Sequence, residues 1–281
     1  MNEEVKKTME IVGLSNEELK DKCPSIFTTT PASHLSLKYS FVPTIQVIED
    51  VKKLGWTPTE ATQVKSRTAK TKGKGKHMIT FEHEDFKTKD DEKIQMLLIN
   101  SHDGTSNFQL EIGVFRLVCS NGLVIKDNDM GAVKVRHLGY SFKDITAAVN
   151  ELVSNIPNVF NKMNKMKETE LTEDQMAELA LKSACVRFDL EYEKESENLV
   201  KMLEIDELLG VDRREDKGNG LYEVFNRVQE KLINGGFEYL NDRTGKYRKA
   251  RPIKNFQQNT RVNQELWGIA ESFIEDAELV A

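Results

Sequence analysis

The sequence has few cysteines and no long apolar run, and these two shortages exclude several classes of protein. Its three cysteines, Cys23, Cys119 and Cys185, lie far apart and include no CxxC pair, which disfavours a disulfide framework, a zinc site and a redox dithiol. No apolar stretch approaches the roughly 18 residues of a membrane helix, and the opening MNEEVKKTME lacks the apolar region of a signal peptide. We therefore expect a cytoplasmic protein without a membrane partner.

The common catalytic motifs are missing as well. HExxH, GxSxG and GxxxxGK[ST] do not occur, and KGKGKH lacks the spacing of a phosphate-binding loop. Cys119 lies in a stretch of apolar alternation, RLVCSNGL, so we interpret it as a core thiol and not as a nucleophile. The sequence thus predicts no catalytic residue and no cofactor. We expect a protein that is not an enzyme, and an enzyme with an unrecognised site remains the alternative.

A metal site is the other chemistry that the sequence raises. His83 and His102 lie near acidic residues that suit a divalent cation, namely Glu82, Glu84, Asp85 and Asp103. In a strand, however, His83 points away from the face that Glu82 and Glu84 share, and Asp103-Gly104 is typical of a hairpin turn. We therefore predict turn and surface positions for these residues, no metal, and a positive φ at Gly104.

The hydrophobic period predicts an α+β fold. With 281 residues, 38% of them hydrophobic, the chain can bury a sizeable core. VPTIQVIEDVKKLGW, residues 42–56, has helical spacing and ends at a glycine. Short stretches rich in β-branched and aromatic residues follow, and they predict an antiparallel meander at residues 57–66, 76–86, 92–100 and 107–125. In it, SHDGTSN joins the third strand to the fourth.

The second half of the chain predicts helices. Three- and four-residue apolar spacing, with Thr172 and Gln175 as a capping pair and glycines at two ends, indicates helices at residues 141–168, 171–190, 197–210 and 221–235. We assign residues 1–34 to an N-terminal segment, 35–140 to the meander core and 141–281 to a helical region with a basic C-terminal segment. One α+β body with a helical extension is favoured over two independent domains.

Positive charge is concentrated in two segments of a chain whose formal net charge is −6. KSRTAKTKGKGKH, residues 65–77, joins the first two expected strands, and RTGKYRKARPIK, residues 243–254, follows the last predicted helix. Cations track the phosphates of a single nucleic-acid strand, and a ring offers a face for its bases. The predicted nucleic-acid contacts are Lys65, Arg67, Lys70, Lys72, Lys74, Lys76, Arg243, Lys246, Tyr247, Arg248, Lys249, Arg251 and Lys254. Two unrelated solvated loops are the alternative.

Two longer stretches resemble a known family. INSHDGTSNFQLEIGVFRLVCSNGLVI is similar to the signature of a phage- and plasmid-borne family, domain of unknown function 932, in which a SHDG turn leads to a strand with R-L/V-V-C-x-N. VFNRVQEKLINGGFEYLNDRTGKYRKARPIKNFQQNTRVNQELWGIAE resembles the family's ending, and the resemblance covers about residues 35–275. It implies a mobile genetic element as the context.

A more distant similarity concerns the order of elements. A helix, then GW, then a meander with a DGT hairpin resembles the single-strand annealing proteins of recombination, and this resemblance implies DNA held in a basic groove.

Two functions remain open at this stage. The first is a non-enzymatic phage or plasmid protein that binds single-stranded DNA and promotes annealing or recombination as a homo-oligomer. The second is a host-takeover factor whose acidic helical half binds and inhibits or redirects a host protein. The first hypothesis further predicts that residues 65–77 are a mobile loop with little to pack against. We also expect Arg116 to reach the surface or to pair with Glu82 or Glu111, because an unpaired buried guanidinium is costly.

Overall fold

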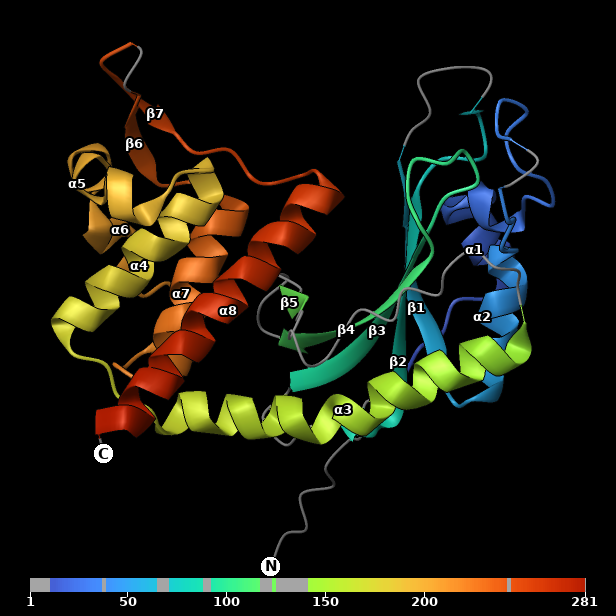
Figure 1. Ribbon diagram of the computed structural model, residues 1–281, viewed down its shortest axis with the longest axis horizontal. Coiled ribbons are helices and arrows are strands. Elements are labelled where there is room, and N and C mark those ends of the chain that lie inside the picture. The colour runs from blue at the N-terminus through green and yellow to red at the C-terminus, as the bar shows by residue number, and fades with distance from the viewer. Residues whose placement is uncertain are drawn as a thin grey trace, which may run out of the picture. The chain divides into compact units, whose positions relative to one another are not determined.

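A computed structural model describes residues 11–36, 39–64, 71–87, 92–116, 123–124, 141–241 and 244–280 of the chain (Figure 1). The chain divides into two compact units. Unit 1 comprises residues 1–117 and 130–154, and unit 2 comprises residues 118–129 and 155–281. The division falls inside helix α3 (Phe142–Glu168), whereas the sequence placed a boundary at residue 140.

Unit 1 contains an antiparallel meander, as predicted. Its strands pair in chain order, with His77 opposite Asn100 and Ile99 opposite Gln109. SHDGTS lies between the third and fourth strands, and Gly104 has a φ of 78°, which confirms the predicted turn conformation. The four strands are β1 (Thr57–Gln63), β2 (His77–Lys87), β3 (Glu92–Asn100) and β4 (Gln109–Arg116).

Two helices pack against this sheet. The amphipathic helix α2 (Thr44–Lys53) contributes Val47, Ile48 and Val51, all fully buried, and Gly55, which follows its C-cap residue, has a φ of 89°. Strand β3 is buried on both faces, because the consecutive residues Met96, Leu97, Leu98 and Ile99 are all at most 2% exposed. Helix α1 (Asn16–Lys22) and the short 3₁₀ helix η1 (Pro24–Phe27) pack beside β1 and α2 (Figure 1).

Unit 2 is mainly helical. Its core lies among α4, α7 and α8, where the rings of Phe225 and Trp267 meet edge to face with centroids 6.0 Å apart. Gln229 also donates to Asn263 across the α7–α8 contact, at 2.8 Å. The elements are α4 (Glu173–Phe188), α5 (Tyr192–Met202), α6 (Ile205–Leu209), η3 (Arg214–Asp216), α7 (Leu221–Asn234), β6 (Glu238–Asn241), β7 (Lys246–Lys249) and α8 (Phe256–Val280), with the short β5 (Leu123–Val124) beside α8.

The helical predictions are confirmed in most places and wrong in one. Thr172 and Gln175 form the predicted capping box at the start of α4. The helix predicted at residues 197–210 is instead two helices, because Leu203 and Glu204 are extended. Leu203 forms a bridge with Tyr239 of β6, so a tertiary pairing interrupts a helical sequence pattern at this point.

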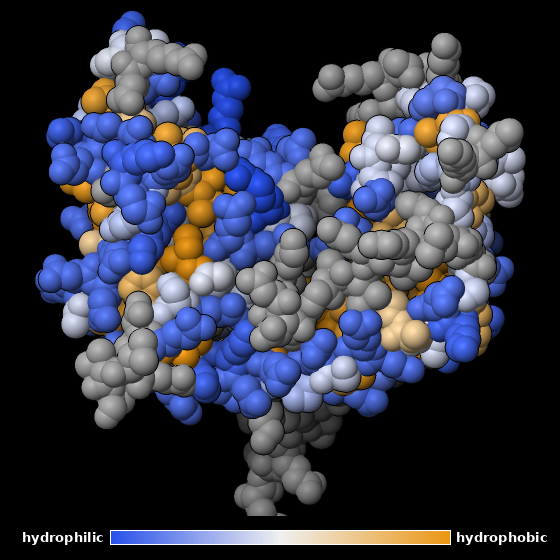
Figure 2. Space-filling view, viewed as in Figure 1, coloured by the Kyte–Doolittle hydropathy of each residue, from blue (hydrophilic) through white to orange (hydrophobic). Residues whose placement is uncertain are grey.

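The face of the described residues seen in Figure 2 is mainly hydrophilic, with smaller hydrophobic areas between the polar ones. Within the ranges described above, none of the helices is both long enough and apolar enough to cross a membrane.

Candidate nucleic-acid interface

The second basic segment forms a β-hairpin that the sequence pattern did not predict. Lys246, Tyr247, Arg248 and Lys249 are the four residues of β7, and all are exposed. Tyr239 of β6 pairs with Arg248, so these two side chains share one face of the hairpin. The residues that carry these cations therefore lie on a strand and not in a loop. Arg251 and Lys254 follow β7 and are exposed, and Arg243 lies outside the described residues.

Glycine allows the end of this hairpin to pack closely against α7. The backbone N–H of Gly236 donates to the Ala250 carbonyl at 2.9 Å, and that of Ala250 donates to Phe237 at 2.8 Å. Gly235 has a φ of 69°, and a Cβ at this position would lie 2.5 Å from the Ala250 oxygen. Only glycine fits there without moving the backbone. The close contact therefore positions Arg251.

A recess of about 600 Å³ lies at the base of this hairpin. Four of its lining residues are cationic and none is acidic. Phe188 and Tyr239 give it an aromatic wall, with ring centroids 5.1 Å apart. A volume of this size is typical of small-ligand sites. The recess is lined by Arg187 and Phe188 of α4, Tyr239 of β6, Arg248 and Lys249 of β7, and Ala250 and Arg251.

Arg187 is the half-buried cation of this recess. Its Nη2 donates to the Arg251 carbonyl at 2.6 Å, and its Nε is buried without an acceptor. Within the described part of the chain it pairs with no carboxylate. Burial lowers the pKa of its guanidinium, and Tyr239 acts in the opposite direction. An arginine stays charged under such conditions. The recess therefore holds positive charge that the described side chains do not neutralise.

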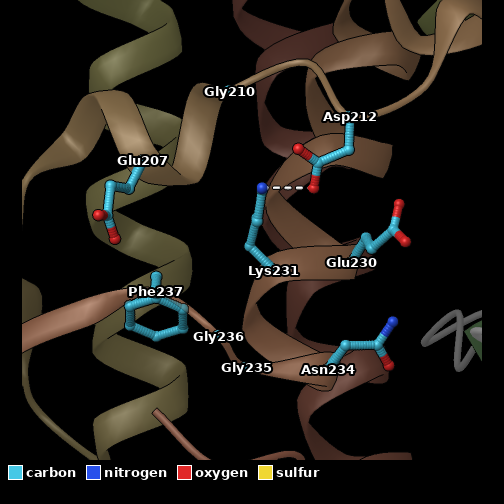
Figure 3. Close-up of a pocket in the computed structure, with 9 residues that line it drawn as sticks. All are labelled: Glu207, Gly210, Asp212, Glu230, Lys231, Asn234, Gly235, Gly236 and Phe237. Atoms are coloured by element: carbon cyan, nitrogen blue, oxygen red, sulfur yellow. Dashed lines mark hydrogen bonds and ion pairs between the residues drawn. The ribbon is translucent and has the colours of Figure 1, made fainter. Parts of the chain in front are cut away.

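A neighbouring pocket in unit 2 differs from the recess because most of its charged side chains form ion pairs within the protein. It measures about 440 Å³, and Figure 3 shows Lys231 directed at Asp212, with which it forms an ion pair. Glu230 accepts two bonds from Arg213, at 2.7 and 2.6 Å. The charges of this pocket are largely compensated within the protein. It is consequently a poorer anion site than the recess at the hairpin.

The first basic segment differs from the prediction where it is described. Lys65, Arg67 and Lys70 lie outside the described residues, and Lys72 is exposed. The prediction that its side chains have little to pack against is wrong for the two lysines nearest β2.

Lys74 Nζ donates to the Pro31 carbonyl at 2.6 Å and to Thr30 Oγ1 at 3.1 Å. Lys76 is half-buried, and burial lowers its pKa against the opposing effect of Glu111. These two side chains thus have structural partners in unit 1.

Unit 1 also contains a buried histidine cluster, of which His102 was predicted to lie in a surface turn. His77 and His102 are 1% and 0% exposed, and both rings contact the hydroxyl of Thr44, at the start of α2. The Oγ1–Nε2 distances are 2.8 Å to His77 and 3.2 Å to His102. The surface prediction for His102 is wrong because residues 28–36 cover the turn, with the Ala32 N–H donating to the His102 carbonyl at 2.8 Å. It is also wrong for Glu82 and Asp103, which are 6% and 8% exposed.

The hydrogen bonds determine the proton positions in this cluster. His77 Nδ1 faces the Gly75 carbonyl at 3.0 Å and must donate to it, so the neutral ring accepts at Nε2 from the Thr44 hydroxyl. The Thr44 oxygen then accepts from Asn100 Nδ2 at 3.0 Å and from His102 Nε2. His102 Nδ1 is left as a buried acceptor without a donor. The two histidines are therefore opposite tautomers.

Burial keeps both histidines neutral. It lowers the pKa of His77 to about 4 and that of His102 to about 3, with a further lowering at His102 from its neighbours His77 and Lys74. No group of three metal-ligating side chains is found in the described ranges. Because the rings are saturated by internal bonds on three of four nitrogens, we assign this cluster to the architecture of unit 1.

Sequence comparisons place the chain among known proteins. The family model described as "Domain of unknown function (DUF932)" matches residues 31–267. The chain belongs to this family. Two relatives, the UPF0380 proteins YfjQ and YafZ of Escherichia coli (strain K12), are each 29% identical over 261 residues, which cover 93% of this chain and 92% of theirs. No solved structure matches the chain.

The DUF932 region contains both the histidine cluster and the recess, and it contains residues that sequence reasoning did not select. Arg187, Phe188 and Tyr239 lie outside the two basic segments, yet they line the recess with three of the predicted contacts, Arg248, Lys249 and Arg251. Alternation in FEYL before the basic run was a strand signal that could have identified Tyr239. The two predicted basic segments lie in different units. Cys119 lies outside the described residues, as does the side chain of Arg116.

Proposed function

We propose that this protein binds single-stranded DNA, without enzymatic activity, in the cytoplasmic DNA metabolism of a phage or plasmid. The basic hairpin of unit 2 is the contact surface. The observation that carries the proposal is the recess, in which four cations and two aromatic rings line one surface free of carboxylates. Cations of this kind neutralise phosphates, and rings stack on unpaired bases, which a duplex does not offer.

The exposed side chains around the recess extend the contact along a strand. Lys246, Tyr247 and Lys254 are exposed and close to the recess residues in sequence. Tyr247 pairs with Leu240, so it lies on the face of the hairpin opposite to Arg248, and it keeps 63% of its surface accessible. An exposed tyrosine among lysines and arginines is a stacking platform that does not depend on base identity. Binding without strong sequence preference is the property that strand annealing requires, and a homo-oligomer of the chain would present several such platforms to one strand.

The proposal is tested by the salt dependence of binding. Fluorescence anisotropy with a labelled oligothymidylate, at several salt concentrations, should give a plot of log K against log salt with a negative slope. Changing Lys246, Arg248 and Lys249 together to Gln should weaken binding and flatten that slope by up to about 0.7 for each phosphate that is no longer neutralised. A duplex of the same length should compete poorly, because its bases are already stacked.

The matched control removes the same charge elsewhere in unit 2. Lys201, Arg214 and Lys217 are exposed and do not line the recess, so their triple change to Gln should leave the slope near that of the parent. If both triple variants bind as the parent does, the hairpin is not a DNA surface. The hypothesis of a host-protein partner would then take first place.

A further inference from the structure

The recess at the base of the hairpin has more positive charge than the binding of one internal phosphate of a strand requires. An internal phosphodiester carries one negative charge, whereas the recess presents four cations around a single volume of about 600 Å³. A terminal phosphate monoester carries about 1.5 to 2 negative charges at neutral pH and three acceptor oxygens. The monoester is therefore the better electrostatic match.

The aromatic wall adds a second requirement on the ligand. The Phe188 and Tyr239 rings are half-buried, and they form a wall of the same recess that the arginines line. The isolated inorganic phosphate ion has no part that could use this wall. A purine or pyrimidine base attached to the phosphate would stack on it.

Arg187 is held ready for an anion. The Arg251 carbonyl accepts one of its Nη2 protons, so the planar group is oriented without a carboxylate that would neutralise it. Its buried Nε has no acceptor. This atom is closed to solvent, so an anion in the recess would meet the Nη groups of Arg187 and not its Nε.

We propose that the recess binds one nucleoside 5′-monophosphate unit, with the base on the Phe188–Tyr239 wall and the phosphate monoester at Arg187, Arg248 and Arg251. This inference rests on the proposed function, since it assigns the strongest-binding nucleotide of a strand to the recess. A free nucleotide and the 5′-phosphorylated end of a strand share this chemistry.

Calorimetric titration with deoxyadenosine 5′-monophosphate tests the recess directly. We expect this nucleotide to bind at least about tenfold more tightly than either deoxyadenosine or inorganic phosphate, because only the nucleotide uses both parts of the recess. Arg187→Gln and Arg248→Gln should each weaken binding about tenfold or more. Arg214→Gln, which removes the same charge from an exposed site outside the recess, should leave the affinity of the parent.

Arg248→Gln keeps the test valid if Arg187→Gln fails to fold, because the Arg248 side chain is exposed. Tyr239→Leu should weaken binding of the nucleotide while Tyr239→Phe retains it, since the ring and not the hydroxyl stacks on the base. The proposal is overturned if inorganic phosphate binds as tightly as the nucleotide, or if Arg248→Gln behaves like Arg214→Gln.

Two further ligands complete the test. One distinguishes a strand end from a free nucleotide as the natural ligand, and the other distinguishes failure of this inference from failure of the proposed function. Preference for a 5′-phosphorylated oligonucleotide over its 5′-hydroxyl form supports a strand end, and equal affinity for the two together with binding of the mononucleotide supports a free nucleotide. Circular single-stranded DNA has no end. Binding of the circle without binding of the mononucleotide or preference for the phosphorylated end would overturn the inference and leave the proposed function standing. Binding of the mononucleotide without binding of the circle would overturn the proposed function alone.

Discussion

At the residue scale, one hydroxyl group connects three distant parts of unit 1. Thr44, His77 and His102 lie in a helix, a strand and a turn, and the sequence suggests no relation among them. The turn itself was predictable, because the φ of 78° at Gly104 follows from local chemistry. The burial of His102 was not, because it depends on the packing of residues 28–36 against the turn. Local sequence rules therefore predict the backbone conformation of a residue better than they predict whether remote segments cover it.

The neutral histidines predict an acid-sensitive stability. Below pH 6.5 an unfolded chain protonates both rings, while the folded chain keeps them neutral down to about pH 4 for His77 and about pH 3 for His102. The unfolded state therefore binds more protons in this window, and stability falls as the pH falls. His77 alone should lower the free energy of unfolding by about 3 kcal/mol between pH 6.5 and pH 4.

Urea unfolding at intervals from pH 7 to pH 4 measures this effect. Carboxylates contribute to the same slope, so the informative comparison is with the double variant His77→Gln, His102→Gln, which should lose stability less steeply on acidification. Equal slopes in the parent and the double variant would mean that the two rings titrate normally.

At the element scale, apolar periodicity predicted the helices and the meander, and it failed at the basic hairpin. β7 has the sequence KYRK, and a strand of exposed cations lacks the apolar alternation by which strands are recognised. The break between α5 and α6 was hidden for a related reason, since Leu203 fits a helical pattern but pairs with Tyr239. In both cases the structure differs from the prediction at residues that pair with β6. Neither could be derived without knowing that β6 lies against α5 and the end of α4.

Gly235 provides a test of how the hairpin is held. Gly235 and Gly236 both have positive φ, at 69° and 99°, so alanine is conformationally strained at either position. Only at Gly235 does the new Cβ meet backbone, with the Ala250 oxygen at 2.5 Å and nothing within 4 Å at Gly236. Gly235→Ala should therefore lower the free energy of unfolding by about 1–3 kcal/mol more than Gly236→Ala.

The same pair should differ in nucleotide binding, because the displaced segment includes Ala250 and Arg251. Denaturant unfolding and the calorimetric titration together measure the two effects. Equal destabilisation by the two alanines would contradict the close contact at the base of the hairpin.

At the scale of the whole molecule, the two basic segments of the sequence are not equivalent. Sequence alone placed them in one DNA-binding role, because composition does not report to which unit a segment belongs. In the structure, Lys74 is engaged by Thr30 and Pro31, while the cations of β7 remain exposed. Three cations of the recess, Arg248, Lys249 and Arg251, could thus be selected from the sequence, whereas Arg187 and the aromatic wall, which tertiary packing brings to them, could not.

Hydrogen exchange distinguishes the two segments in the intact protein. A 5′-phosphorylated oligonucleotide should slow amide exchange in residues 235–251 and at the end of α4, and leave β2 to β4 unchanged, because the described contact surface lies in unit 2. Arg248→Gln should abolish this protection. Protection confined to residues 71–77 would instead assign DNA binding to the first basic segment.

The charge of β7 has a further consequence that concerns solubility. Among the described residues β7 pairs only with β6, so its other backbone edge is open to hydrogen bonding with a strand of another molecule. Lysine and arginine on an edge strand oppose such pairing, because two copies would bring like charges together. A bound polyanion neutralises that repulsion. The cations proposed to bind DNA therefore also protect the free chain against edge-to-edge aggregation, and this protection is relaxed while a nucleic-acid strand occupies the hairpin.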